Sequence, residues 1–265
     1  MRLLDMVGAG RAKRQHRFGC GAHIVNGGAK AVPGRGAKAV SALRAATALH
    51  IFLLSLSVFA QKEVSPGVFE IGKVRVHKQN RTIEFPAVVN MKEGIAEYFL
   101  VSNQGKVHES VLRTEVQPYE INVAMLLLGG KGAQTNFFAP DKPPAGDALT
   151  IEVSWKGRFS TKRVAAEELV FDRARKASMS KGTWTYNGSF QFEGIFVAQE
   201  AGSIISVMSD PEALINNPRE RREDDENWIV NTKAVPAVET PVMVTIKVPR
   251  IQPNGGGVSD TNSRQ

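Results

Sequence analysis

The first regular pattern in the chain is an alternation of apolar and polar residues. Residues 69–76 alternate as a half-buried strand does, and residues 82–89 alternate in the same way after a polar turn at 77–81. Pro86 lies within the second segment, and proline cannot donate a hydrogen bond to a neighbouring strand. We therefore predict two strands joined by a turn, with Pro86 at a sheet edge or a bulge.

A second hairpin is predicted over residues 95–113. Its turn is Asn103-Gln104-Gly105, because Asn and Gly tolerate the positive φ angles that hairpin turns need. Successive side chains of a strand point to opposite faces. His108 and Ser110 would then share one face, with Glu109 on the other.

Residues 118–128 have the period of a helix rather than a strand. Pro118 suits the first helical turn, and the glycine pair at 129–130 suits the C-terminal stop. Apolar residues recur at the spacing of one helix face, at Ile121, Ala124, Met125 and Leu128. We predict a buried helix whose Met and Leu stripe belongs to the core and not to a cofactor site.

The second half of the chain predicts further strands. Residues 148–155 and 159–164 form a hairpin about 156–158, and residues 165–176 include a short helix or a helix-like turn. Period-two patterns and turn residues predict the remaining strands at 183–189, 194–199, 203–208 and 242–248. Residues 228–230 are predicted to return to the core.

Asp210 is followed by proline and then by apolar residues. This order predicts a one-turn helix over 210–217 with Asp210 as its N-cap. Together these elements predict an α+β, strand-dominant fold, in which antiparallel hairpins pack on one main helix at about 118–128.

The N-terminal part differs from the rest in charge and hydropathy. Residues 1–40 are a basic leader without apolar period and are predicted to be disordered; as an extension before a signal segment they also fit a gene-model artefact. Residues 41–60 predict a signal peptide, in which Val58 and Ala60 precede a cleavage site before Gln61. The alternative is an uncleaved membrane anchor. The export signal predicts a periplasmic or secreted protein that meets the membrane only during export.

The predicted boundaries after the signal peptide are a linker at 61–67, one domain at 68–250 and a disordered tail at 251–265. The leader accounts for the whole net charge of +8, since the chain beyond residue 60 keeps 25 of 34 basic and 25 of 26 acidic residues. A neutral body gives no general footprint for nucleic acid. The single cysteine, Cys20, lies in the leader, so disulfides, thiolate zinc sites and iron–sulfur clusters are excluded for the body.

The candidate site is the run from Lys106 to Ser110, where versatile polar side chains crowd beside the predicted helix. The candidate ligand-binding residues are Lys106, His108, Glu109, Ser110, Asp210 and Asn216. Weaker candidates for a metal are His108, Glu109 and Asp210. The charge run at 219–227 is typical of a solvated loop, although its acids at 224–226 also offer oxygen ligands to a hard cation.

Several segments together resemble the YdjY-like domain of bacterial proteins. They are Arg81–Val89, Gly94, Glu97-Tyr98, Gly105–Leu112, Trp184, Asn187–Ser189 and Ser209–Asn216. The resemblance covers about residues 68–248 and implies an exported or envelope domain of uncharacterised function. Some relatives are described as ferredoxin-like, but a body without cysteine excludes such a cluster, and no other cofactor is predicted.

Three functions are open at this point. The first is a non-catalytic envelope domain that binds a protein partner or a small ligand, which suits a neutral, strand-rich body. The second is a hydrolase centred on His108, with Glu109 or Asp210 to orient it and Ser110 or Ser189 as nucleophile; no Gly-x-Ser-x-Gly motif supports it. The third is a metal-dependent enzyme at the same histidine.

Overall fold

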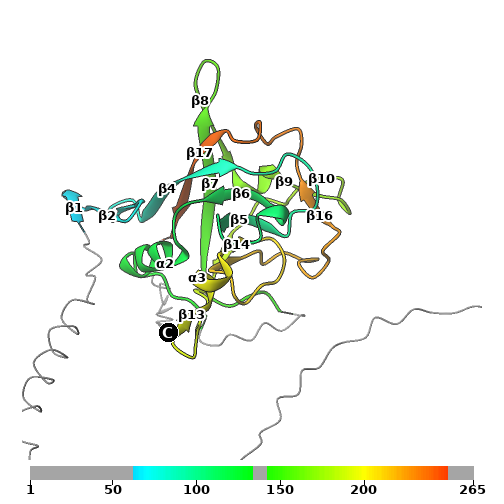
Figure 1. The fold of residues 1–265 in the computed structure, drawn as a ribbon. Coiled ribbons are helices and arrows are strands. Elements are labelled where there is room, and N and C mark those ends of the chain that lie inside the picture. The colour runs from blue at the N-terminus through cyan, green and yellow to red at the C-terminus, as the bar shows by residue number, and fades with distance from the viewer. Residues whose placement is uncertain (1–61, 134–141, 250–265) are drawn as a thin grey trace, which may run out of the picture. The chain divides into compact units, whose positions relative to one another are not determined.

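The main sheet of the protein closes on itself. A computed structural model describes residues 62–133 and 142–249 (Figure 1). In the order in which they pair, the strands of the closed part are β4 (Thr82–Val89), β17 (Pro241–Lys247), β7 (Asp147–Lys156), β11 (Trp184–Tyr186), β15 (Ile215–Asn216), β14 (Ser203–Ser206), β5 (Tyr98–Ser102) and β6 (Ser110–Thr114). Because β6 pairs back onto β4, these eight strands form a barrel.

Shorter elements are attached to this barrel. A meander extends the β4 edge through β1 (Lys62–Ser65), β2 (Val68–Ile71) and β3 (Val74–His77), while β8 (Thr161–Ala165) pairs only with β7. A separate three-stranded sheet contains β9 (Val170–Asp172), β10 (Ala177–Ser178) and β16 (Trp228–Val230), and a two-stranded hairpin contains β12 (Gln191–Phe192) and β13 (Ile195–Phe196). The helical elements are η1 (Val107–Glu109), α2 (Pro118–Leu127), η2 (Ala166–Leu169) and α3 (Val197–Ala201).

The barrel interior is filled by apolar side chains that alternate with outward-facing residues. In β4 every second residue from Ile83 to Val89 is buried, and β7 and β17 show the same period. This pattern is the period-two signal of a strand with one face in a core. β5 and β14 are buried at every position.

The predicted fold class is wrong, although the strand dominance is confirmed. The structure is a closed barrel with one substantial helix, not a set of hairpins packed on that helix. α2 flanks the barrel beside β2, β3 and β4, and its predicted buried stripe is confirmed by the burial of Ile121, Ala124, Met125 and Leu128. Closure depends on long-range pairing, such as β6 with β4, which local periodicity does not encode.

The predicted hairpin over residues 95–113 is also wrong, because β5 and β6 pair in parallel. Neither Asn103 nor Gly105 has the positive φ angle that the expected turn requires. Instead the Gly105 N–H donates to the Ser102 carbonyl at 3.0 Å, and η1 carries the chain back to the start of β5. Gly105 is needed for close approach, since a Cβ there would meet the Gly202 carbonyl oxygen at 2.8 Å.

Other local predictions have mixed outcomes. The hairpin about 156–158 and the strands at 203–208 and 242–248 are confirmed by β7–β8, β14 and β17. The return of residues 228–230 to the core is confirmed by the burial of Trp228 and Val230. The predicted strand at 69–76 is instead two strands, β2 and β3, joined by a turn at Gly72, whose φ is 55°. The predicted strand at 194–199 gives way to helix α3 from Val197.

Pro86 lies where β4 changes partner. On one side of β4, β3 pairs as far as Glu84 and β6 pairs from Val88 onward. The Pro86 carbonyl between them accepts a hydrogen bond from Thr114 Oγ1 at 2.6 Å. The prediction of a sheet edge or a bulge is therefore wrong, since β4 pairs with β17 on one side and with β3 and β6 on the other. Proline is tolerated because it lies in the gap between β3 and β6, where its missing N–H has no ladder partner to lose.

Some predictions concern residues that the structure does not describe. The leader, the signal peptide and the C-terminal tail lie outside the described residues. Within residues 62–133 and 142–249, none of the helices has the length and apolar character needed to cross a membrane. Residues 62–65, part of the predicted linker, form β1.

Candidate functional site

The run from Lys106 to Ser110 spans a change of backbone conformation. Val107–Glu109 is a turn of 3-10 helix, and β6 begins only at Ser110. A 3-10 turn rotates successive side chains by about 120° rather than 180°. The His108 side chain is 72% exposed, whereas Ser110 is fully buried. The prediction that these two side chains share a face is therefore wrong.

Ser110 has a structural role. Its hydroxyl donates to the Leu112 carbonyl at 2.7 Å, and its own carbonyl accepts from Asn90 Nδ2 at 2.8 Å. The same Asn90 amide donates to the Val107 carbonyl. Asn90 therefore clamps both ends of the turn to β4, a role that the sequence did not reveal. The Ser110 hydroxyl is directed at backbone and not at His108.

Two glutamates lie beside this turn. His108 Nε2 is 3.3 Å from Glu109 Oε1. Burial, followed by the hydrogen bond and the negative charge of Glu109, raises the pKa of the Glu97 carboxyl above its ordinary value. Lys106 acts in the opposite direction on the same pKa. Glu97 was not selected as a site residue, because it lies in a different predicted strand, twelve residues before Glu109 in the sequence.

A phenol connects the exposed lysine to a buried carboxylate. Lys106 Nζ lies 3.2 Å from the Tyr98 hydroxyl, which donates to Asp210 Oδ2 at 3.0 Å. Burial, followed by the charge and hydrogen bond of Asp210, raises the pKa of Tyr98. The structure thus links two of the predicted candidates, Lys106 and Asp210, through a tyrosine that was not among the candidate residues.

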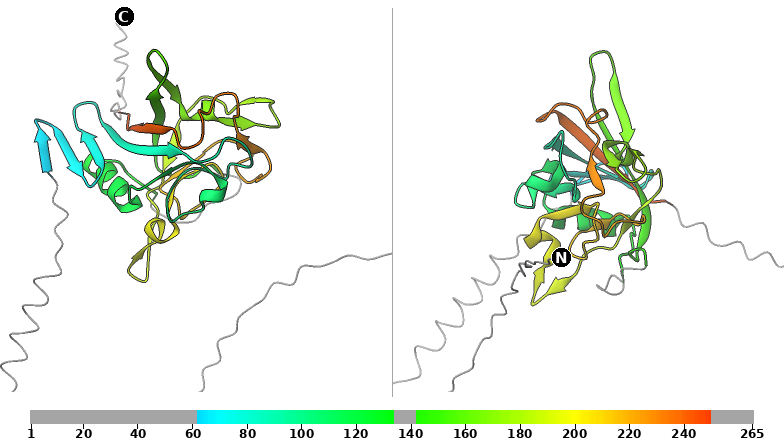
Figure 2. Two further views of the ribbon diagram at one scale, coloured as in Figure 1. Left: turned by 45° about the horizontal axis from the view of Figure 1, so that its top comes forward. Right: turned by 90° about the vertical axis from the view of Figure 1, so that its right-hand side faces the viewer.

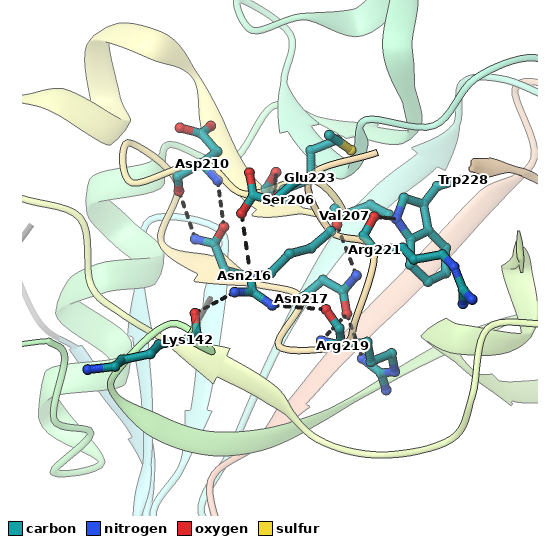
Figure 3. Close-up of polar contacts among 12 residues, drawn as sticks. Lys142, Ser206, Val207, Asp210, Asn216, Asn217, Arg219, Arg221, Glu223 and Trp228 are labelled. Carbon is teal, nitrogen blue, oxygen red and sulfur yellow. Dashed lines mark hydrogen bonds and ion pairs between the residues drawn. The ribbon is translucent and has the colours of Figure 1, made fainter. Parts of the chain in front are cut away.

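Asp210 and Asn216 belong to a fully satisfied buried network (Figure 3). The Asp210 N–H donates to Asn216 Oδ1 at 2.9 Å, and Asn216 Nδ2 donates back to the Asp210 carbonyl at 2.8 Å. Asn216 Nδ2 also donates to Asn187 Oδ1 at 2.8 Å, and Asn187 Nδ2 donates to the Ala213 carbonyl at 2.7 Å. These amides fix the segment before β15, and both N–H groups of Asn216 Nδ2 are used within the protein.

The predicted one-turn helix at 210–217 is wrong. Asp210 Oδ1 accepts from the Glu212 N–H at 2.9 Å, so the side chain caps a turn, and the chain then enters β15. Asp and Asn side chains stabilise such turns as readily as helix starts. The parallel pairing of β15 with β14 decides between the two.

A second polar network lies next to the first, around Asn217 (Figure 3). Asn217 Nδ2 donates to the Val207 carbonyl at 3.0 Å. The buried Arg222 guanidinium donates to the carbonyls of Lys142 and Arg219.

Arg219 forms an ion pair of 2.9 Å with the buried Glu167. Burial lowers the pKa of Arg219, against the opposing effect of Glu167. The run at 219–227 is therefore only partly solvated: its acids at 223–226 are exposed, but Arg222 is an internal anchor.

The proposed catalytic side chains do not converge. Ser110 is bound to backbone, and the Ser189 hydroxyl accepts from the Ala198 N–H at 3.1 Å, at the start of α3. Among the residues that the structure describes, no group of three or more His, Cys, Asp or Glu side chains is arranged to hold a metal ion. The four surface cavities described by their lining are not lined by Lys106, His108 or Glu109.

An apolar pocket lies elsewhere, beside α3 and the β12–β13 hairpin. Its volume is about 510 Å³, and its lining is Phe190, Phe192, Ile195, Val197, Glu200, Ala201 and Glu212. Phe192 is 62% exposed and Ile195 52% exposed. Sequence reasoning placed two strands here but selected no residue. The available signal was the apolar spacing of Phe190, Phe192 and Ile195 about a Glu-Gly turn.

The fold and the pocket define a class: a closed β-barrel domain with an apolar core, a buried polar network before β15 and an apolar surface pocket. The YdjY domain matches residues 74–247, which is most of the described chain. The protein belongs to the YdjY domain family. No match was found among curated proteins, and none among solved structures.

Proposed function

We propose that the protein is an exported, non-catalytic binding domain that takes an apolar segment of a protein partner in the pocket beside α3. The observation that carries this proposal is the exposure of Phe192 and Ile195 at the mouth of an apolar pocket of about 510 Å³. Large apolar side chains that gather on a surface and frame a hollow are typical of interaction sites.

The charge at the rim of the pocket indicates which charge the partner segment should carry. The two charged lining residues, Glu200 and Glu212, are acidic and exposed, and Glu193 in the hairpin turn is exposed as well. Among the described residues, no lysine or arginine lines the pocket. A segment with apolar side chains between basic residues therefore complements it in both respects.

Export is the second part of the proposal. It is supported by the apolar segment 45–60 with its Val58 and Ala60 and by a body without cysteine. A periplasmic or secreted location follows, and the partner is then an envelope protein. Bacterial origin is part of the same proposal, through the YdjY-like resemblance.

Peptide binding tests the pocket. A fluorescein-labelled peptide with the repeat Lys-Leu-Lys-Phe is titrated with the chain from Gln61 onward, and its anisotropy is compared with that of the repeat Glu-Leu-Glu-Phe. We expect the basic peptide to bind, the acidic one to bind at least tenfold more weakly, and Phe192→Ser to lose at least fivefold in affinity.

The matched control is Phe159→Ser, since Phe159 is also an exposed aromatic residue in a hairpin but is not part of the pocket lining. Equal loss in the two variants, or no binding of the basic peptide, contradicts the proposal.

A second candidate function rests on the contact of His108 with Glu109 and of Glu109 with Glu97. Perturbed carboxyls beside a histidine are a recurrent feature of acid–base and metal sites, so an enzyme centred on His108 is the alternative. Metal content by mass spectrometry separates the two functions, with His77→Ala as control for His108→Ala. His77 is the matched imidazole, 3.5 Å from Glu84. Stoichiometric metal that only His108→Ala removes would favour the enzyme.

A further inference from the structure

The β7–β8 hairpin projects from the barrel, as the views in Figures 1 and 2 show. β17 pairs with β7 only as far as Ser154, whereas β8 pairs with β7 to Lys156. The last residues of β7 and the turn therefore have β8 as their single neighbour in the main sheet. Whatever this tip contacts must come from outside the barrel.

The tip has one aromatic ring and an excess of positive charge. Phe159 is 90% exposed, the highest exposure of any large apolar residue in the described chain. Residues 153–166 contain four basic residues and no acid. Arg163 is paired with Glu152 at 2.7 Å. Within the described residues, Lys156, Arg158 and Lys162 have no carboxylate at salt-bridge distance.

The turn holds this arrangement in place. The Gly157 N–H donates to the Ser160 carbonyl at 2.9 Å. A Cβ on Gly157 would lie 2.7 Å from that carbonyl oxygen, so the turn is as tight as the backbone allows. The Arg158 guanidinium lies 5.1 Å from the centre of the Phe159 ring. The ring is therefore presented at the apex with a cation beside it.

We propose that the tip of the β7–β8 hairpin is a docking site for an anionic phospholipid surface. The tip is a narrow hairpin with one exposed ring, so it suits a deformable surface better than a rigid protein partner, which would need a matching hollow. Aromatic rings favour the interface between headgroups and acyl chains, and lysine and arginine are attracted to anionic headgroups. Three free cations and one ring give weak, reversible, salt-dependent binding. This site is separate from the pocket beside α3 and does not depend on it.

Vesicle co-sedimentation tests the site. The chain from Gln61 onward is used, because it contains the whole closed barrel and its core without the apolar segment 45–60. Its circular dichroism and that of each variant are recorded first. Vesicles of phosphatidylcholine with 30% phosphatidylglycerol are compared with vesicles of phosphatidylcholine alone in low salt.

We expect binding to the anionic vesicles and little to the neutral ones. Each of the three cations contributes roughly fivefold, so the triple variant Lys156→Gln, Arg158→Gln, Lys162→Gln should lose at least tenfold. Phe159→Ser should lose a few-fold. The control triple Lys131→Gln, Lys176→Gln, Lys233→Gln makes the same change in net charge at exposed positions elsewhere and should keep most of the binding.

Three results would overturn the proposal. Equal losses in the two triple variants would show a net-charge effect without a site. Full release from vesicles by 10 mM glycerol phosphate at constant ionic strength would indicate a site for soluble phosphate. Tighter binding to an equal charge concentration of duplex DNA than to vesicles, abolished by the same hairpin triple, would reassign the tip to nucleic acid.

Discussion

Two regions that hold the predicted site residues differ in how their polar groups are used. The outer region, Lys106–Glu109, is a surface turn with an exposed lysine and histidine. The inner region is the buried network of Asp210, Asn216 and Asn187, in which each amide group has a protein partner. The predicted polar site residues are therefore of two kinds, functional candidates and structural residues. A structural residue is recognised by its burial and by its hydrogen-bond partners within the protein.

Tyr98 joins the two regions. Its ring is buried in β5, and its hydroxyl contacts Lys106 on one side and Asp210 on the other. The comparison therefore predicts that the effect of a substitution on folding stability decreases from the inner region to the outer region. Substitutions in the inner region should affect folding stability most, the tyrosine less, and the outer region least.

The largest effect is expected for Asn216→Ala. This change leaves the Asp210 N–H, the Asp210 carbonyl and Asn187 Oδ1 without their partner in a buried site. Unsatisfied buried groups are costly, so we expect a loss of about 3 kcal/mol in the free energy of unfolding. Urea unfolding measures it. Asn80→Ala, in an exposed turn, is the control and should change stability by less than about 0.5 kcal/mol. A loss in Asn216→Ala as small as that of the control would refute the structural role.

Tyr98→Phe should have an intermediate effect. The hydroxyl donates to a carboxylate, and hydrogen bonds to charged groups contribute about 1.5–3 kcal/mol, against about 1 kcal/mol for a neutral pair. Tyr186→Phe is the matched control, since the Tyr186 hydroxyl donates to the neutral Asn122 Oδ1 at 2.6 Å. We expect the Tyr98 variant to lose about twice as much stability in urea unfolding. A larger loss for Tyr186→Phe would show that the link to Asp210 adds little.

The smallest effect is expected for Glu97→Gln, and it depends on pH. The pKa of Glu97 in the folded protein is raised above the ordinary 4.5, so folding favours the protonated form. Its contribution to stability is therefore present below pH 4.5 and is lost as pH rises through the raised pKa. Glutamine stays neutral at every pH, so the variant does not lose this stability as the pH rises. We expect the variant to be more stable than wild type at pH 7 by roughly 0.5 kcal/mol, after allowance for solvent screening.

The difference between Glu97→Gln and wild type should vanish at pH 4, as thermal unfolding at the two pH values will show. Glu93→Gln, an exposed neighbour without a resolved ion pair in the described chain, should show no such pH dependence. A variant that is less stable than wild type at pH 7 would mean that the Glu97 charge is stabilising there through Lys106.

Helices and strands were predictable where a short segment itself contains the periodicity and the start and stop residues that define the element. The helix at 118–127 follows from Pro118, an apolar face and a glycine stop, and the β7–β8 hairpin follows from alternation about Gly157. The candidate site was predictable only in part. Lys106 and Asp210 both contact Tyr98, which was part of the family resemblance but was not selected as a site residue. Asn216 was selected as a candidate ligand-binding residue, and the structure places it in a buried hydrogen-bond network.

The sequence by itself determined the strand dominance, the main helix and the neutral cysteine-free body, because each depends on composition or on neighbours within about ten residues. It also determined the family, through short segments that can be compared one by one. The tertiary structure alone decided the closure of β6 onto β4, the parallel pairing of β5 with β6, and the division between buried Asn216 and exposed His108. The physical reason is that hydrogen-bond partners across a barrel are separated by tens of residues. Local periodicity shows that a strand has a buried face, but it does not specify which strand lies beside it.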